Sequence, residues 1–170
     1  MADGERASWT NPASAEWRER PGGFRRWETS THLGDGPAVW DWAGTEVLRW
    51  GVKTRSGFSV RPKATAVRPG DRPVIVAHPF GLSVREPVEV VAVVDESDRV
   101  GFAYRTLPGH PVTGEEAFIV HRDGSSVLLT IRSLTRPGRG HWRVMYPVLL
   151  LAQAVARRRY LRALRVRAAR

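Results

Sequence analysis

Apolar and polar residues recur with different periods along the chain, and each change of period marks an expected element. Residues 24–33 alternate as in a strand. Residues 37–53 instead have helical spacing, and Pro37 suits the first helical turn because its missing N–H has no partner there. Gly57 lies close to where that helix should stop. The chain is therefore expected to begin with one strand and one helix, whose apolar face holds Val39, Ala43, Val47 and Trp50.

After Gly57 the spacing becomes strand-like and stays so as far as residue 134. Short apolar runs alternate with turn residues, and residues 95–99 and 121–125 have the pattern of tight hairpins. Consecutive hairpins produce an antiparallel sheet because each strand reverses the direction of the one before it. The expected strands are residues 58–64, 74–78, 84–95, 99–107, 115–122 and 126–134.

A break that contains Pro and Gly ends the last strand at residues 136–140, and helical spacing from near Tyr146 predicts a long C-terminal helix. Leu149, Ala152 and Ala156 lie on its apolar face. Such a helix is the natural cover for the concave face of a curved sheet. We therefore predict an α+β fold, with a long C-terminal helix packed on a curved antiparallel sheet in a helix-grip (START-like) arrangement. A small closed β-barrel with an external helix is the alternative.

The first 24 residues show no sustained period and contain Trp9 and Trp17, whose large rings are costly to leave in water. We expect an irregular, Trp-containing lead-in over residues 1–24 that is held to the domain surface as a strap. The chain has 170 residues, of which 42% are hydrophobic, and this is the size of one ordinary domain. A single α+β domain is accordingly expected over residues 25–170.

The chain contains no cysteine, which excludes disulfides and thiolate metal sites, and its first residues lack the apolar run of a signal peptide. Its five histidines are scattered without the spacing of a ligand pair, and no Gly-rich loop is followed by a lysine. We therefore expect a cytoplasmic protein with no metal and no cofactor.

The formal net charge is +10, and seven arginines lie in the stretch from Arg157 to Arg170. This concentration at one end of the chain weakens the case for nucleic acid as a partner. A solvated face of the C-terminal helix is the usual role of such arginines. Contact of the stretch from Arg157 to Arg170 with a membrane surface is an alternative interpretation. The oligomeric state is left open by these patterns.

Residues 101–118, GFAYRTLPGHPVTGEEAF, read as strand, turn, strand, and they bring polar, titratable and turn residues together. Tyr104 and Thr106 share a strand face with Phe102, so their hydroxyls could meet a ligand in a cavity. Core packing with internally satisfied hydroxyls is the alternative. Arg105 points the other way on that strand, towards solvent.

His110, Glu115 and Glu116 in the same stretch are candidates for catalysis, because a histidine and a buried carboxylate can act as general acid and base. The alternative is that His110 only shapes the turn while a glutamate pairs with an arginine. Since adjacent residues of a strand point to opposite faces, at most one of the two glutamates faces inward.

The central motif also resembles a known family. GFAYRTLPGHPVTGEEAF is similar to the signature of uncharacterised protein family 0548, also called domain of unknown function nineteen-ninety. LGDGPAVWDWAGTEVLRW at residues 33–50, the Arg136-Pro137 step and the terminal helix with Gln153 support the resemblance. Arg105 stands where the family usually has glycine. The resemblance implies no established activity.

We expect a protein that binds a small hydrophobic or amphipathic ligand between the sheet and the C-terminal helix. The polar contacts would come from Tyr104, Thr106, His110 and Glu115. An enzyme of cyclase-like or hydrolytic type, with His110 and a glutamate as acid and base, is one alternative. An interaction protein that uses its basic C-terminal helix is another.

Overall fold

The computed structural model describes residues 7–19, 21–63, 66–78, 81, 83–138 and 140–165, leaving aside the side chains of residues 141 and 142. The start of the expected lead-in, residues 1–6, and the end of the basic C-terminal stretch, residues 166–170, lie outside the described residues. Residue 64, the last of the strand expected at 58–64, also lies outside them. The elements in chain order are β1 (Arg25–Asp35), α1 (Pro37–Val47), α2 (Gly51–Thr54), β2 (Ser59–Arg61), β3 (Val74–Ala77), β4 (Val84–Asp95), β5 (Arg99–Thr106), β6 (Val112–Asp123), β7 (Ser126–Pro137), α3 (His141–Val144) and α4 (Tyr146–Ala163).

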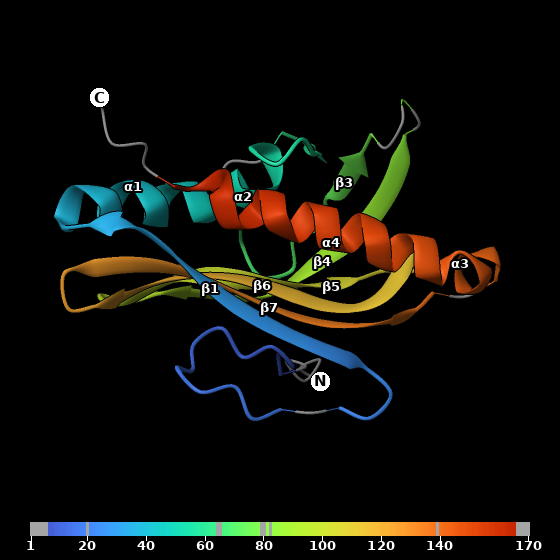
Figure 1. Cartoon of the computed structure of the whole chain (residues 1–170), viewed down its shortest axis with the longest axis horizontal. Coiled ribbons are helices and arrows are strands. Elements are labelled where there is room, and N and C mark those ends of the chain that lie inside the picture. Colours follow the sequence, from blue (N-terminus) through green and yellow to red (C-terminus); the bar gives the residue numbers. More distant parts are fainter. Residues whose placement is uncertain are drawn as a thin grey trace.

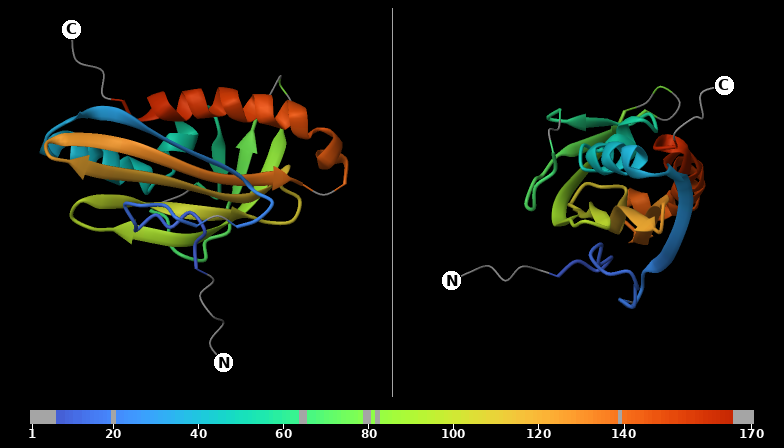
Figure 2. Two further views of the ribbon diagram at one scale, coloured as in Figure 1. Left: turned by 60° about the horizontal axis from the view of Figure 1, so that its bottom comes forward. Right: turned by 90° about the vertical axis from the view of Figure 1, so that its left-hand side faces the viewer.

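The strands form one seven-stranded sheet in the order β1-β7-β6-β5-β4-β3-β2, and every neighbouring pair is antiparallel. The helices lie on one face of this sheet, with α4 running across it, and the N-terminal segment lies on the other face (Figures 1 and 2). β1 and β2 end the sheet at opposite edges, so the sheet is open. The helix-grip fold predicted from the sequence is confirmed, and the closed barrel is wrong.

The prediction of a single helix over residues 37–53 is wrong, because the helix is interrupted between α1 and α2. Trp50 adopts a left-handed backbone conformation with φ of 63°. This places its ring in the core, where it is 2% exposed and lies 4.6 Å from the ring of Phe102. Burial of so large a ring offsets the backbone strain of about 1–3 kcal/mol. The next residue must be glycine, since a Cβ on Gly51 would lie 2.5 Å from the carbonyl oxygen of Glu46.

Two pairs of strands lie unusually close together at a glycine: β5 and β6 at Gly101, and β6 and β7 at Gly114. A Cβ on Gly101 would lie 2.2 Å from the carbonyl oxygen of Phe118, and one on Gly114 would lie 1.7 Å from that of Leu134. Only glycine fits these positions, which is a common use of glycine inside strands.

β6 begins three residues earlier than the alternation predicted, because its pairing with β7 continues as far as the register of Val112 with Pro137. Backbone hydrogen bonds extend the ladder where side-chain alternation has ended.

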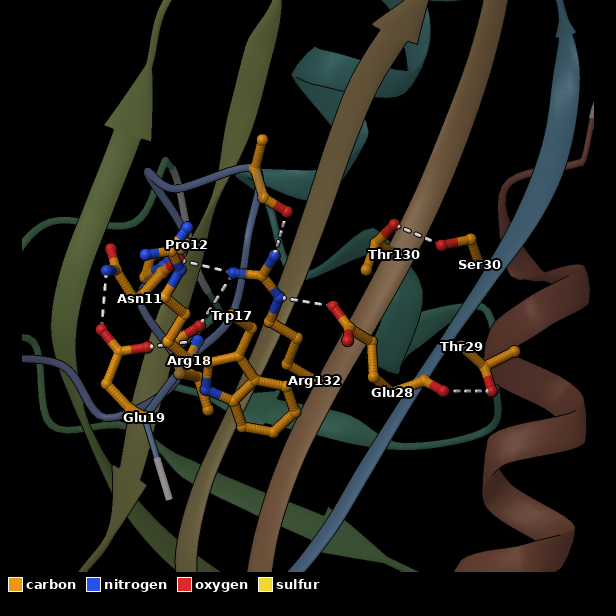
Figure 3. Close-up of polar contacts among 12 residues, drawn as sticks. Asn11, Pro12, Trp17, Arg18, Glu19, Glu28, Thr29, Ser30, Thr130 and Arg132 are labelled. Carbon is orange, nitrogen blue, oxygen red and sulfur yellow. Dashed lines mark hydrogen bonds and ion pairs between the residues drawn. The ribbon is translucent and has the colours of Figure 1, made fainter. Parts of the chain in front are cut away.

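Arg132 anchors the N-terminal segment on the outer face of the sheet, the face opposite the helices (Figure 3). Its side chain is almost fully buried, and its guanidinium donates to the carbonyl oxygens of Thr10, Asn11 and Ala15 at 3.1, 2.7 and 2.9 Å. It also donates to Glu28 on β1 at 2.9 Å. The Arg132 side chain on β7 therefore connects β1 and the N-terminal segment, whose described residues form no helix or strand before β1.

Glu115 makes a second anchor on the same face. Its carboxylate accepts hydrogen bonds from the backbone N–H and the hydroxyl of Thr10, at 2.9 and 2.7 Å, and from the guanidinium of Arg105 at 2.8 Å. The Arg105 guanidinium lies 4.0 Å from the centre of the Trp9 ring. The expectation that Arg105 faces solvent is therefore wrong: it faces outward, but the N-terminal segment covers it.

We predict that Arg132→Met releases the N-terminal segment. Three carbonyl oxygens lose a charged donor, which should lower the free energy of unfolding by about 3 kcal/mol. Urea unfolding measures that loss, and the rate of chymotrypsin cleavage next to Trp17 measures release of the segment. Arg25→Met removes an exposed guanidinium at the start of β1, away from the bond that chymotrypsin cleaves, and should change neither. Equal cleavage rates in the two variants would contradict the anchoring role.

Candidate functional site

A cavity of about 640 Å³ lies between the inner face of the sheet and α4. Its α4 wall carries apolar side chains, among them Val148, Leu149 and Leu151, together with the polar side chains of Gln153, Arg157, Arg159 and Tyr160. Val148 and Leu151 are 56% and 69% exposed, so this wall also reaches the surface of the molecule. The remaining walls carry polar groups from α2 and the sheet: Lys53, Glu86, Tyr104, Thr106, His110, Glu116, Ser133 and Thr135.

Lys53 is the central polar group of the cavity, and its side chain is 4% exposed. Its ammonium donates to the hydroxyl of Tyr160 on α4 at 2.6 Å and lies 3.1 Å from the carboxylate of Glu116 on β6. The hydroxyl of Tyr104 on β5 donates to the same Glu116 oxygen. Four elements thus contribute one group each to a connected network.

Aromatic rings surround the Lys53 ammonium. The centres of the Phe58, Tyr104, Phe118 and Tyr160 rings lie 4.7–5.7 Å from its nitrogen. Burial alone would lower the pKa of Lys53, but the charge of Glu116 and the nearby tyrosine oxygens outweigh it and raise that pKa well above its ordinary value. Lys53 therefore stays protonated and is not available as a nucleophile.

His110 also borders the cavity, and its ring is neutral. Burial, together with the nearby positive charge of Lys53, lowers its pKa from 6.5 to about 3. Its Nδ1 accepts the backbone N–H of Val112 at 3.1 Å, so the ring proton is on Nε2, which lies 3.9 Å from the carboxylate of Glu86. Burial also raises the pKa of Glu86. Because its one lone pair is occupied, His110 is built to donate a hydrogen bond and not to accept a proton.

The comparisons with known proteins place the chain in a family. A model of the domain of unknown function DUF1990 matches residues 9–163. The chain belongs to this family. A UPF0548 protein of Deinococcus radiodurans is 35% identical over 150 residues, which are 81% of this chain and 74% of that relative. The resemblance inferred from the central motif is thereby confirmed.

Solved structures share the fold at low sequence identity. The hypothetical protein jhp0584 of Helicobacter pylori has a TM-score of 0.57 at 12% identity, over 83% of this chain and 84% of that one. Ara h 8.0201 has a TM-score of 0.52 at 11% identity, over 84% and 99% of the two chains. TTHA0849 of Thermus thermophilus has a TM-score of 0.53 at 15% identity, over 83% and 93%. These likenesses show the helix-grip fold of the DUF1990 chain and nothing about its ligand.

The motif that marks the DUF1990 family divides between the two faces of the sheet. Tyr104, Thr106 and His110 all border the cavity, as the sequence suggested. The hydroxyl of Thr106 accepts the backbone N–H of Gly114 at 2.9 Å, so it is at least partly satisfied internally. The assignment of Glu115 as the ligand-facing carboxylate is corrected. Although Glu115 borders the cavity, its carboxylate lies in the outer-face anchor, and Glu116 is the glutamate that points inward.

Sequence reasoning missed Lys53, Glu86, Tyr160 and Arg157 as parts of the cavity. Two of them had a signal. Lys53 is one of only two lysines and follows the apolar helical face by three residues, and Tyr160 is a polar aromatic on the apolar face of the C-terminal helix. Glu86 pairs with Ile75 of the preceding strand, and local spacing does not specify that its side chain borders a cavity beneath α4.

Within the part of the chain that the structure describes, no three His, Cys, Asp or Glu side chains are grouped so that they could hold a metal ion. Among the same described residues, no helix is both long and apolar enough to cross a bilayer.

His110 should make the protein sensitive to acid. The unfolded chain binds a proton near pH 6.5 and the folded chain only near pH 3, so stability is complete above about pH 6.5 and falls as the pH drops towards 3. Relative to His110→Asn, the wild type should lose about 3 kcal/mol more between about pH 7 and pH 4. Urea unfolding across this range measures the difference. His32→Asn, at an exposed histidine, is the control and should follow the wild type.

Lys53 and Glu116 should be strongly coupled. Lys53→Met leaves a buried carboxylate without its cation and should lower the free energy of unfolding by about 3–5 kcal/mol. Adding Glu116→Gln should restore part of that loss, because the uncompensated charge is then gone. A double-mutant cycle by urea unfolding should yield a coupling energy above about 1 kcal/mol. Additive losses would show that the two charges do not depend on each other.

Proposed function

We propose that this member of the DUF1990 family binds a small amphipathic molecule in the cavity between sheet and α4. The observation that carries the proposal is the cavity itself, which combines apolar side chains of α4 with the polar groups around the buried Lys53, here called its polar inner end. Its volume of about 640 Å³ lies within the range of about 300–1,000 Å³ typical of small-molecule sites. The fold shared with the solved structures is compatible with such a role but does not select it.

The polar inner end supports binding more than catalysis. Lys53 is protonated and held by Glu116 and Tyr160, and the lone pair of His110 is occupied by a backbone N–H. Neither group is poised to accept a proton from a substrate. The Nε2–H of His110 is instead a neutral hydrogen-bond donor. We assign to Tyr104, Thr106, His110 and Glu116 the role of orienting the polar part of the ligand.

The neutral fluorescent probe phenylnaphthylamine tests the proposal. Its emission should rise when it enters the cavity, and this rise should saturate with the protein concentration. Ala152→Trp places a large ring in the cavity wall and should weaken binding of the probe at least about tenfold, since bulk at this position occupies the ligand's space.

Ala154→Trp is the matched control. Ala154 is an exposed alanine on the same helix and does not line the cavity, so probe binding should be unchanged. Circular dichroism establishes that both variants are folded. Failure of the wild type to bind the probe, or equal weakening in both variants, would contradict binding in this cavity.

A further inference from the structure

One side of the cavity, where β7 faces α4, carries a positive charge without a carboxylate partner. Arg157 lines the cavity, donates to the hydroxyl of Ser133 at 3.4 Å and lies over the ring of Trp27 at 4.2 Å. Among the described residues, Arg157 takes part in no ion pair. Burial lowers the pKa of its guanidinium, but an arginine remains charged at neutral pH.

Two further polar atoms on this side have no partner among the residues that the structure describes. The side-chain oxygens of Thr135 and Gln153 are buried there without a hydrogen bond, and both residues line the cavity. A buried polar atom without a partner costs free energy that a ligand can recover. These orphan atoms therefore indicate where the polar end of a ligand would be stabilised.

The topology brings these groups to one place. Thr135 follows Ser133 by two residues and shares its strand face, and Gln153 precedes Arg157 by one helical turn. α4 runs back along the sheet from the end at which β7 finishes (Figure 1). Moving from Ser133 to Thr135 and from Arg157 to Gln153 thus leads towards the same end of the cavity. We call this set of four residues the β7/α4 seam.

We propose that the β7/α4 seam is a subsite for the anionic head of the ligand, a carboxylate carried on an apolar body. The proposal rests on the ligand-binding function and adds the chemical class. A guanidinium matches a carboxylate in charge and in the geometry of its paired donors. The Thr135 hydroxyl donates, and the Gln153 amide donates once it is rotated by half a turn. The apolar body then lies along Val148, Leu149 and Ala152 of α4.

The charges around the cavity favour an anion over a cation. Lys53 already occupies the Glu116 carboxylate, and the Glu86 carboxylate lies 3.9 Å from Nε2 of His110. Arg157 and the exposed Arg159 add two positive charges to the lining. A single guanidinium in the seam matches a single negative charge, so a monocarboxylate fits better than a phosphate dianion.

Three ligands with the same chain and different heads test this subsite: decanoate, decanol and decylamine. Each is used at neutral pH to displace phenylnaphthylamine from the full-length protein. Decanoate should displace the probe at concentrations about tenfold lower than decanol, because charge-assisted hydrogen bonds are the stronger ones. Decylamine should be the weakest competitor. Equal displacement by decanoate and decanol, or stronger displacement by decylamine, would overturn the proposal.

Arg157→Gln should make decanoate and decanol equivalent competitors, with each displacement expressed relative to the probe affinity measured for the same variant. Arg158→Gln removes a charge from an exposed position on the same helix, outside the cavity, and should keep the tenfold preference. Thr135→Val, which keeps the shape and removes the hydroxyl, provides an independent variant and should weaken decanoate severalfold. Retention of the full preference in both Arg157→Gln and Thr135→Val would refute the subsite.

The two proposals fail in different ways. If phenylnaphthylamine does not bind the wild type, the cavity is not a ligand site and the seam has no ligand to recognise. If the probe binds and decanoate and decanol displace it equally, the binding function stands and only the anionic subsite is wrong.

Discussion

The buried ammonium of Lys53 is the constraint on which this structure depends. An ion removed from water is tolerated only when opposite charge and hydrogen-bond acceptors replace its hydration. Glu116 supplies the charge, Tyr160 supplies an acceptor, and four aromatic faces enclose the rest. Because these groups come from strands and from α4, compensation of one charge also determines where the helix meets the sheet.

Similar charged residues have different roles on the two faces of the sheet. On the inner face, Lys53 and Glu116 leave room for a cavity beside them. On the outer face, the N-terminal segment supplies hydrogen-bond partners to both charged residues. Its carbonyl oxygens accept from Arg132, and its N–H and hydroxyl groups donate to Glu115. Glu115 and Glu116 are neighbours in the chain, yet strand geometry places them in networks on opposite sides of the sheet.

Local patterns were enough to predict most of the fold. The strands from 84–95 onward follow from alternation and from turn residues, both of which act within a few positions. The alternation of side chains along a strand also predicted that only one of Glu115 and Glu116 faces inward. It could not tell which one, because the phase of β6 is set by long-range packing of Phe118 against Phe102 and Tyr160. The break at Trp50 was missed for the same reason: its left-handed conformation is stabilised by rings of a distant strand.

Burial along α4 is uneven. Tyr160 and Leu164 near its end are 4% and 0% exposed, whereas Val148, Leu151 and Val155 present apolar side chains to solvent. The free energy of local opening follows the contacts that opening breaks. The first half of α4 therefore separates from the sheet at lower cost than the second half, which the Lys53 network retains. The helix is graded in stability along its length, and the cavity that both of its halves line is covered by a less stable and a more stable part.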